Sequence, residues 1–165
     1  MAISFPVRPN PRDGKRDTGA PLYKPVTVKD SWERRGYRKT PTNPNGFHWA
    51  SDIPAPTNSI IQLPEEAKLR AKGHDEDAGY WMEWEIITGP WLHRFFRVFH
   101  MLKPCAFSIG TIKNRKYAVG RVDCTGNCSG PHEHAELGKY PWAHARDPRW
   151  DIREELNSAL TRKDW

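Results

Sequence analysis

The sequence predicts an α+β fold in which a small core of a β-hairpin and two or three helices follows a long, extended, proline-rich N-terminal arm. Ten of the fifteen prolines fall within residues 1–64, at intervals that interrupt helices and central strands. The rest of the chain holds several helix start and stop signals and one alternating pattern. We therefore expect residues 1–63 to form the arm. Residues 64–165 should form a small α+β domain with a Cys/His loop and a C-terminal amphipathic helix.

The arm carries all of the chain's excess positive charge. Residues 1–46 contain ten Lys or Arg and four Asp or Glu, whereas the two kinds are equal in number in residues 47–165. Such a segment can neutralise phosphates, an anionic lipid surface or an acidic protein surface, and the charge does not distinguish these. Its widely spaced aromatic residues are costly to leave in water, so we expect them to anchor on a partner. The predicted partner-binding residues are Trp32, Arg34, Arg35, Tyr37, Arg38 and Trp49.

Three helices are expected in the domain. The first, residues 64–72, begins with a proline and acidic residues and stops before a glycine. The second, residues 90–102, has a broad aromatic face and a narrow polar stripe, so it either fills the core or lies on a membrane surface through residues 81–102. The third begins at Asp147 as its N-cap and repeats apolar residues every four positions.

Alternating residues between the second and third helices predict a β-hairpin over residues 105–124. A tight turn at its centre would place Cys105 opposite Cys124. The segment C-T-G-N-C-S-G-P-H-E-H, which starts at Cys124, is rich in small and turn-forming residues that would let a loop fold around an ion. Thiolates and imidazoles suit a closed, structural zinc site. The predicted metal ligands are Cys105, Cys124, Cys128, His132 and His134.

Two alternatives to zinc stay open for the cysteines. The spacing C-x3-C-x3-H-x-H differs from the usual zinc patterns, so a Cys105–Cys124 disulfide, or buried unbonded cysteines beside surface histidines, also fits the sequence. The sequence has no phosphate-binding loop, nucleophile elbow or H-E-x-x-H helix. We therefore expect no catalytic residues and no enzymatic activity, and no cofactor besides the zinc ion.

The stretch Y-P-W-A-H-A-R-D-P-R-W-D-I-R-E-E-L, residues 140–156, resembles the ends of small accessory subunits of mitochondrial respiratory-chain complexes. In one accessory subunit of the NADH dehydrogenase membrane arm, an aromatic-Pro stretch likewise leads to Asp-Pro, a Trp and Glu-Glu-Leu. The resemblance implies a non-catalytic structural subunit, associated with the mitochondrial inner membrane, whose arm binds neighbouring protein subunits. The alternative is an RNA-binding protein of an organellar ribosome, whose basic arm contacts RNA.

Overall fold

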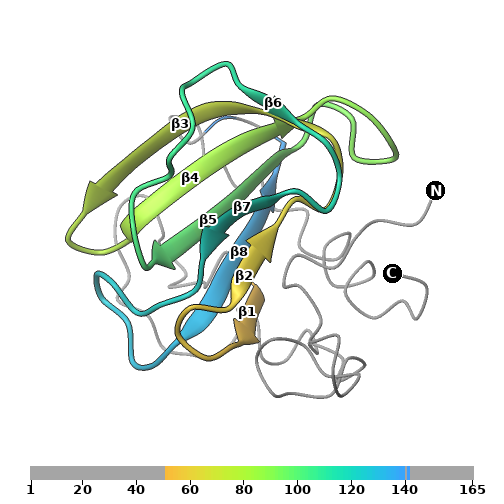
Figure 1. Cartoon of the computed structure of the whole chain (residues 1–165). Helices are drawn as coiled ribbons and strands as arrows, with labels where there is room; N and C mark the ends of the chain where they lie inside the picture. The colour runs from red at the N-terminus through yellow and green to blue at the C-terminus, as the bar shows by residue number, and fades with distance from the viewer. Residues whose placement is uncertain (1–50, 140, 142–165) are drawn as a thin grey trace.

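The fold is known from a computed structural model, which describes residues 51–139 and residue 141. This part of the chain forms two antiparallel sheets and contains no helix (Figure 1). The larger sheet has the strand order β1-β8-β5-β4-β3-β6, and the smaller one pairs β2 with β7. The strands are β1 (Ser51–Pro54), β2 (Ile60–Gln62), β3 (Ala67–Asp75), β4 (Gly79–Ile86), β5 (Phe95–Met101), β6 (Ile112–Lys113), β7 (Ala118–Arg121) and β8 (His132–Gly138).

The predicted α+β fold is wrong, because the described residues are nearly all in strands and their connections. The expected helix over residues 64–72 is largely β3. Here Ala67 and Leu69 are buried and alternate with the more exposed Lys68 and Arg70, which is the two-residue period of a strand with one buried face. That alternation outweighed the helix start signals.

The expected helix over residues 90–102 is also wrong, because its second half is β5. Its residues are buried on both faces of the sheet, which turns a strand into an almost continuous apolar run that resembles a buried helix. The first half is a turn between β4 and β5, in which the amide of His93 donates to the carbonyl of Ile86 at 2.8 Å. Without this helix, the basis for the predicted membrane contact of residues 81–102 is lost.

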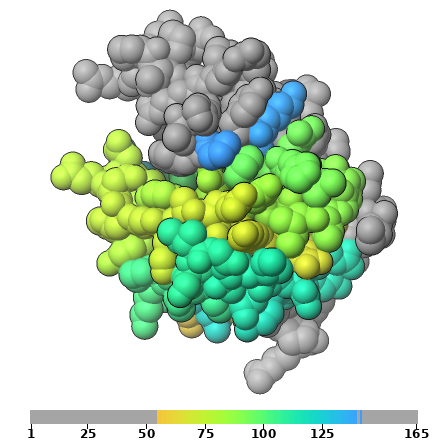
Figure 2. Space-filling model, turned by 90° about the horizontal axis from the view of Figure 1, so that it is seen from above, coloured from red at the N-terminus to blue at the C-terminus, as the bar shows by residue number. Residues whose placement is uncertain are grey.

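The expected hairpin over residues 105–124 does not form. The strand β6 pairs with β3, and β7 pairs with β2, so the two segments belong to different sheets. Residues 51–63, which we assigned to the arm, contribute β1 and β2. The rest of the arm and the C-terminal helix lie outside the described residues. On one face of the molecule, β3 (yellow) and the segment that carries β6 (blue-green) lie side by side (Figure 2).

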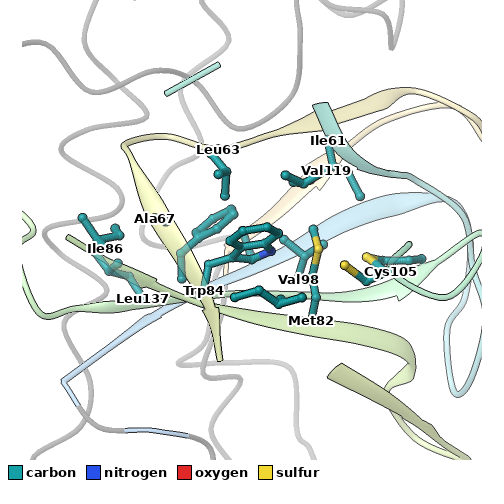
Figure 3. Packing of buried hydrophobic residues seen from close by; sticks show 14 of the residues in the cluster. Ile61, Leu63, Ala67, Met82, Trp84, Ile86, Val98, Cys105, Val119 and Leu137 are labelled. Atoms are coloured by element: carbon teal, nitrogen blue, oxygen red, sulfur yellow. The ribbon is translucent and has the colours of Figure 1, made fainter. Parts of the chain in front are cut away.

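The core lies between the two sheets. One row of side chains crosses four strands of the larger sheet, since Leu69 pairs with Trp84, Trp84 with Phe96, and Phe96 with Leu137. All four are at most 2% exposed. The smaller sheet and its flanks cover this row with Ile61, Leu63 and Val119 (Figure 3). Burial of these large side chains is the main stabilising term of the fold, at roughly 1.5 to 3 kcal/mol for each one.

The neighbouring register positions carry charged residues instead. Glu83 of β4 pairs with Arg97 of β5, which pairs with Glu136 of β8. Successive residues of a strand point to opposite faces, so this row lies on the face turned away from the apolar core. The next alternate positions of β8 along the same face are His134 and His132. The sheet thus positions the candidate site on its polar face.

Candidate metal centre

Three histidines meet where β5 and β8 lie side by side. His100 is near the end of β5, and His132 and His134 are alternate residues at the start of β8. One ligand atom from each lies within 4.8 Å of the others, so the three could hold a metal ion. The ring of Phe99, which pairs with His134 in the register, stacks on the imidazole of His134 with centroids 4.8 Å apart. Sheet pairing therefore holds this group together.

The backbone of His100 is in a conformation that residues with a side chain rarely adopt, with φ of 58°. The amide of His100 donates to the carbonyl of Ala78 at 2.8 Å, and its Nδ1 lies 2.8 Å from the carbonyl oxygen of Thr125. Because a carbonyl oxygen only accepts, Nδ1 carries the proton and Nε2 carries the lone pair. Strained residues that are held in this way cluster at functional sites.

The partner of His100 belongs to a short loop that a disulfide between Cys124 and Cys128 closes. The hydroxyl of Thr125 donates to the carbonyl of Met101 at 2.7 Å and accepts from the amide of Tyr80 at 3.1 Å. This loop therefore ties the end of β5 to the start of β4, and it holds the carbonyl that orients His100.

The other two histidines are oriented by different kinds of acceptor. Nδ1 of His132 lies 2.7 Å from the carbonyl oxygen of Gly130, so this ring also carries its lone pair on Nε2. Nε2 of His134 lies 3.2 Å from a carboxylate oxygen of Glu136. An ionised carboxylate only accepts, which puts the proton of His134 on Nε2 and its lone pair on Nδ1. Each ring thus has a defined nitrogen with which to bind an ion or a proton.

A carboxylate-bearing residue lies next to this group in the register. Asp52 of β1 is directly opposite His134 of β8, and directly opposed residues are cross-strand neighbours. Imidazole and carboxylate donors both suit zinc. The residues present therefore fit a zinc ion.

The structure separates the five predicted metal ligands. His132 and His134 lie in the group described above. Cys124 pairs with Cys128 rather than with Cys105, which is a buried thiol of the apolar core. Burial raises the pKa of the Cys105 thiol, against smaller opposing effects of a backbone hydrogen bond from Phe107 and of the Lys72 charge. Such a thiol stays protonated at neutral pH, which does not suit a metal ligand.

Neither His100 nor Asp52 was among the predicted metal ligands. We placed His100 on the polar stripe of a helix, and only the pairing of β5 with β8 brings it to His134. Asp52 lay within the expected arm, where nothing marked it. The predicted partner-binding residues Trp32, Arg34, Arg35, Tyr37, Arg38 and Trp49 lie outside the described residues, and their role stays a prediction.

The described fold is that of M23 peptidase domains. It is similar to a zinc-containing peptidase from Vibrio cholerae, with a TM-score of 0.52 and 21% identity over 70% of this chain and 35% of that one. It is also similar to a catalytic-domain mutant of the prophage-encoded M23 protein EnpA from Enterococcus faecalis (TM-score 0.55, 21% identity, 70% and 82% of the two chains). The catalytic domain of the antimicrobial peptidase lysostaphin from Staphylococcus simulans gives a TM-score of 0.54 at 15% identity, over 66% and 74% of the chains. No family model and no curated protein matches the sequence.

These similarities overturn the expected function. The neighbours in fold are peptidase domains of bacterial and prophage origin, not accessory subunits of respiratory-chain complexes. The expected mitochondrial inner-membrane location and the expected absence of enzymatic activity are corrected on the same ground, and the organellar ribosome alternative has no support either. Within the described residues, no helix has the length and apolar character needed to cross a bilayer. The short match at residues 140–156 misled because a helix start signal alone can produce it.

Proposed function

We propose that the chain is a zinc-dependent peptidase. One observation carries the proposal: three histidines have ring nitrogens within 4.8 Å of one another, close enough for one ring to hold an ion while the other two transfer protons beside it, in a fold that the chain shares with a zinc-containing peptidase. The match covers about a third of the Vibrio cholerae chain, so the activity is proposed for this domain alone. A structural zinc site would be closed by four protein ligands, whereas a peptidase needs an open position and a nearby base.

We assign the role of metal ligand to His134, through Nδ1, together with Asp52 opposite it in the register. The carboxylate of Glu136 behind His134 is typical of metal-binding histidines, because it raises the basicity of the ring. A zinc ion held there would supply Lewis-acid chemistry by withdrawing electron density from the carbonyl oxygen of a scissile peptide bond.

We assign proton transfer to His100 and His132. Each ring donates its Nδ1 proton to a backbone carbonyl and carries its lone pair on Nε2. A neutral imidazole in this form can accept a proton at Nε2 from an attacking water and return it to the leaving amine. The carbonyls of Thr125 and Gly130 keep the rings in the form that can do so.

The substrate class is a peptide bond, and two preparations test it. A library of short peptides, analysed by mass spectrometry, would reveal cleavage without a prior choice of sequence. Isolated bacterial cell walls are the second preparation, because one neighbour in fold is described as an antimicrobial peptidase. Activity should disappear with a zinc chelator and return when zinc is added.

Three single substitutions in the full chain separate the two roles. His134→Ala should lose both bound zinc and activity. His100→Ala and His132→Ala should keep zinc and lose activity by at least about 100-fold, the usual contribution of acid–base catalysis. His93→Ala is the control, since this ring is largely exposed and contacts Glu85 away from the site. If the wild-type protein binds no zinc, or cleaves no better than His132→Ala, the proposal is wrong.

A further inference from the structure

A row of charged side chains lies behind His134, on the polar face of the larger sheet. It consists of Glu83, Arg97 and Glu136, which are register partners on β4, β5 and β8. Nε of Arg97 donates to Oε2 of Glu83 at 2.5 Å, and Nη1 of Arg97 donates to Oε2 of Glu136 at 3.4 Å. The side chain of Arg97 is fully buried, and those of Glu83 and Glu136 are 2% and 8% exposed.

This row is costly for the fold. Removing an ion pair from water loses the hydration of both charges, and packed apolar residues at the same positions would often be as stable or more so. The three side chains carry two formal negative charges and one positive charge. A metal ion at the adjacent histidines would interact favourably with the carboxylate of Glu136, which lies against His134.

At one end of this row, Glu136 contacts a histidine of the proposed metal centre. Oε2 of Glu136 accepts from Arg97, while its Oε1 lies 3.2 Å from Nε2 of His134. The side chain of His134 is 10% exposed, so little solvent screens this contact. Glu136 therefore has one oxygen held by the row and the other directed at the imidazole. A carboxylate fixed in this way sets which ring nitrogen carries the proton.

The acceptor differs among the three rings. His100 and His132 donate from Nδ1 to backbone carbonyls, whereas His134 donates from Nε2 to a carboxylate. His134 is therefore the ring that would bind an ion through Nδ1.

We propose that Glu136 is a positioning residue that makes His134 an Nδ1 ligand, and that Arg97 and Glu83 hold Glu136 in place for this task. The inference rests on the proposed metal site and adds the residues that orient it. The competing interpretation is that Glu136 is only an ion-pair partner of Arg97 and has no effect on the metal.

The first experiment needs no substitution. The full chain is labelled with ¹⁵N-histidine and loaded with ¹¹³Cd²⁺, and the nitrogen of His134 that is coupled to cadmium is read by NMR. Coupling to Nδ1, with the proton on Nε2, supports the proposal. Coupling to Nε2 of His134 overturns the inference alone. Wild-type protein that takes up no cadmium or zinc overturns both the inference and the proposed function.

The second experiment measures zinc affinity by competition with a chelator. Glu136→Gln keeps the shape of the side chain and removes its charge, and it should weaken zinc binding about tenfold to hundredfold, as loss of the carboxylate behind a ligating histidine usually does. Circular dichroism of the metal-free variant checks that it folds. Unchanged zinc affinity in a folded Glu136→Gln protein would overturn the inference while leaving the peptidase proposal intact.

The chain offers a matched control. Glu85 also contacts an arginine and a histidine, since Nε of Arg70 donates to its Oε2 at 2.6 Å and Nδ1 of His93 lies 3.3 Å from its Oε1. This cluster is outside the group of three histidines. Glu85→Gln should therefore leave zinc affinity unchanged. An equal loss in Glu85→Gln and Glu136→Gln would mean that the effect is one of general charge, which overturns the positioning role.

Discussion

Nδ1 of His100 lies 2.8 Å from the carbonyl oxygen of Thr125, in the middle of the loop that the Cys124–Cys128 disulfide closes. The amide of Thr125 in turn faces the carbonyl of His100 at 3.5 Å. His100 and the loop therefore each donate a hydrogen bond to the other. Features that hold this loop in place should therefore affect the chemistry of the site as well as the stability of the fold.

The disulfide is the first of these features. Replacing both Cys124 and Cys128 with serine should lower the free energy of unfolding by about 2 kcal/mol, the chain-entropy value for so short a loop. Denaturant unfolding, with and without the non-chelating reductant TCEP, measures this loss. Reduction should destabilise the wild type and leave the double variant unchanged. A wild type that is equally stable under both conditions would contradict the expectation.

Gly126 is the second feature. Its φ is +76°, and a Cβ there would lie 2.3 Å from the amide nitrogen of Gly79 and 2.6 Å from the carbonyl oxygen of Asp77. Gly126→Ala combines a strained backbone with a clash against main chain, so we expect a loss of stability on the order of 2 to 5 kcal/mol. Gly130→Ala, where a Cβ meets nothing within 4 Å, should stay within about 0.5 kcal/mol of the wild type. Similar values for the two variants would refute this account of the loop.

Asp52, the second proposed zinc ligand, lies on the edge strand β1 of the larger sheet. Asp52→Asn should weaken zinc binding by about a hundredfold or more, because the amide is a neutral and poorer ligand. Zinc titration against a chelator measures the loss, with His93→Ala as the control, since this exposed ring contacts Glu85 away from the site. A loss no larger than that of the control would remove Asp52 from the ligand set.

Glu65 should make stability depend on pH. Its carboxyl is buried, and its Oε1 has no hydrogen-bond partner among the described residues. Burial raises the pKa of Glu65, and the nearby charge of Arg115 opposes this in part. Between the ordinary value of 4.5 and the raised pKa, the folded state binds more protons than the unfolded state. Stability therefore falls as pH rises through this window and the deficit persists above it.

Denaturant unfolding of Glu65→Gln across this pH range tests whether the Glu65 carboxyl causes this pH dependence of stability. The variant lacks the titrating group, so its stability relative to the wild type should increase as pH rises from about 4.5 and then level off. Glu66→Gln, at the adjacent half-buried position, is the control. A constant difference between Glu65→Gln and wild type over the whole range would show that burial of this carboxyl carries no such penalty.

The local sequence signals conflicted with one another, and the helix signals that we followed gave the wrong elements. The period of two at Ala67 and Leu69 marked a strand, although the proline and acidic residues before it favoured a helix. The apolar run of β5 had no single period, because both faces of that central strand are buried. Helix capping signals and apolar spacing report on neighbouring residues alone, and they mispredicted these segments because sheet pairing is a property of distant parts of the chain.

The amino-acid sequence by itself singled out His132 and His134 as candidate metal ligands, because they stand close to Cys124 and Cys128 in a segment rich in small and turn-forming residues. Only the tertiary structure brought His100 to them, through the pairing of β8 with β5, and placed Asp52 opposite His134 in the register of β1 and β8. It also paired Cys124 with Cys128 and buried Cys105 in the core. These contacts join residues that are far apart in the chain, and they depend on strand order, which local residue patterns do not encode.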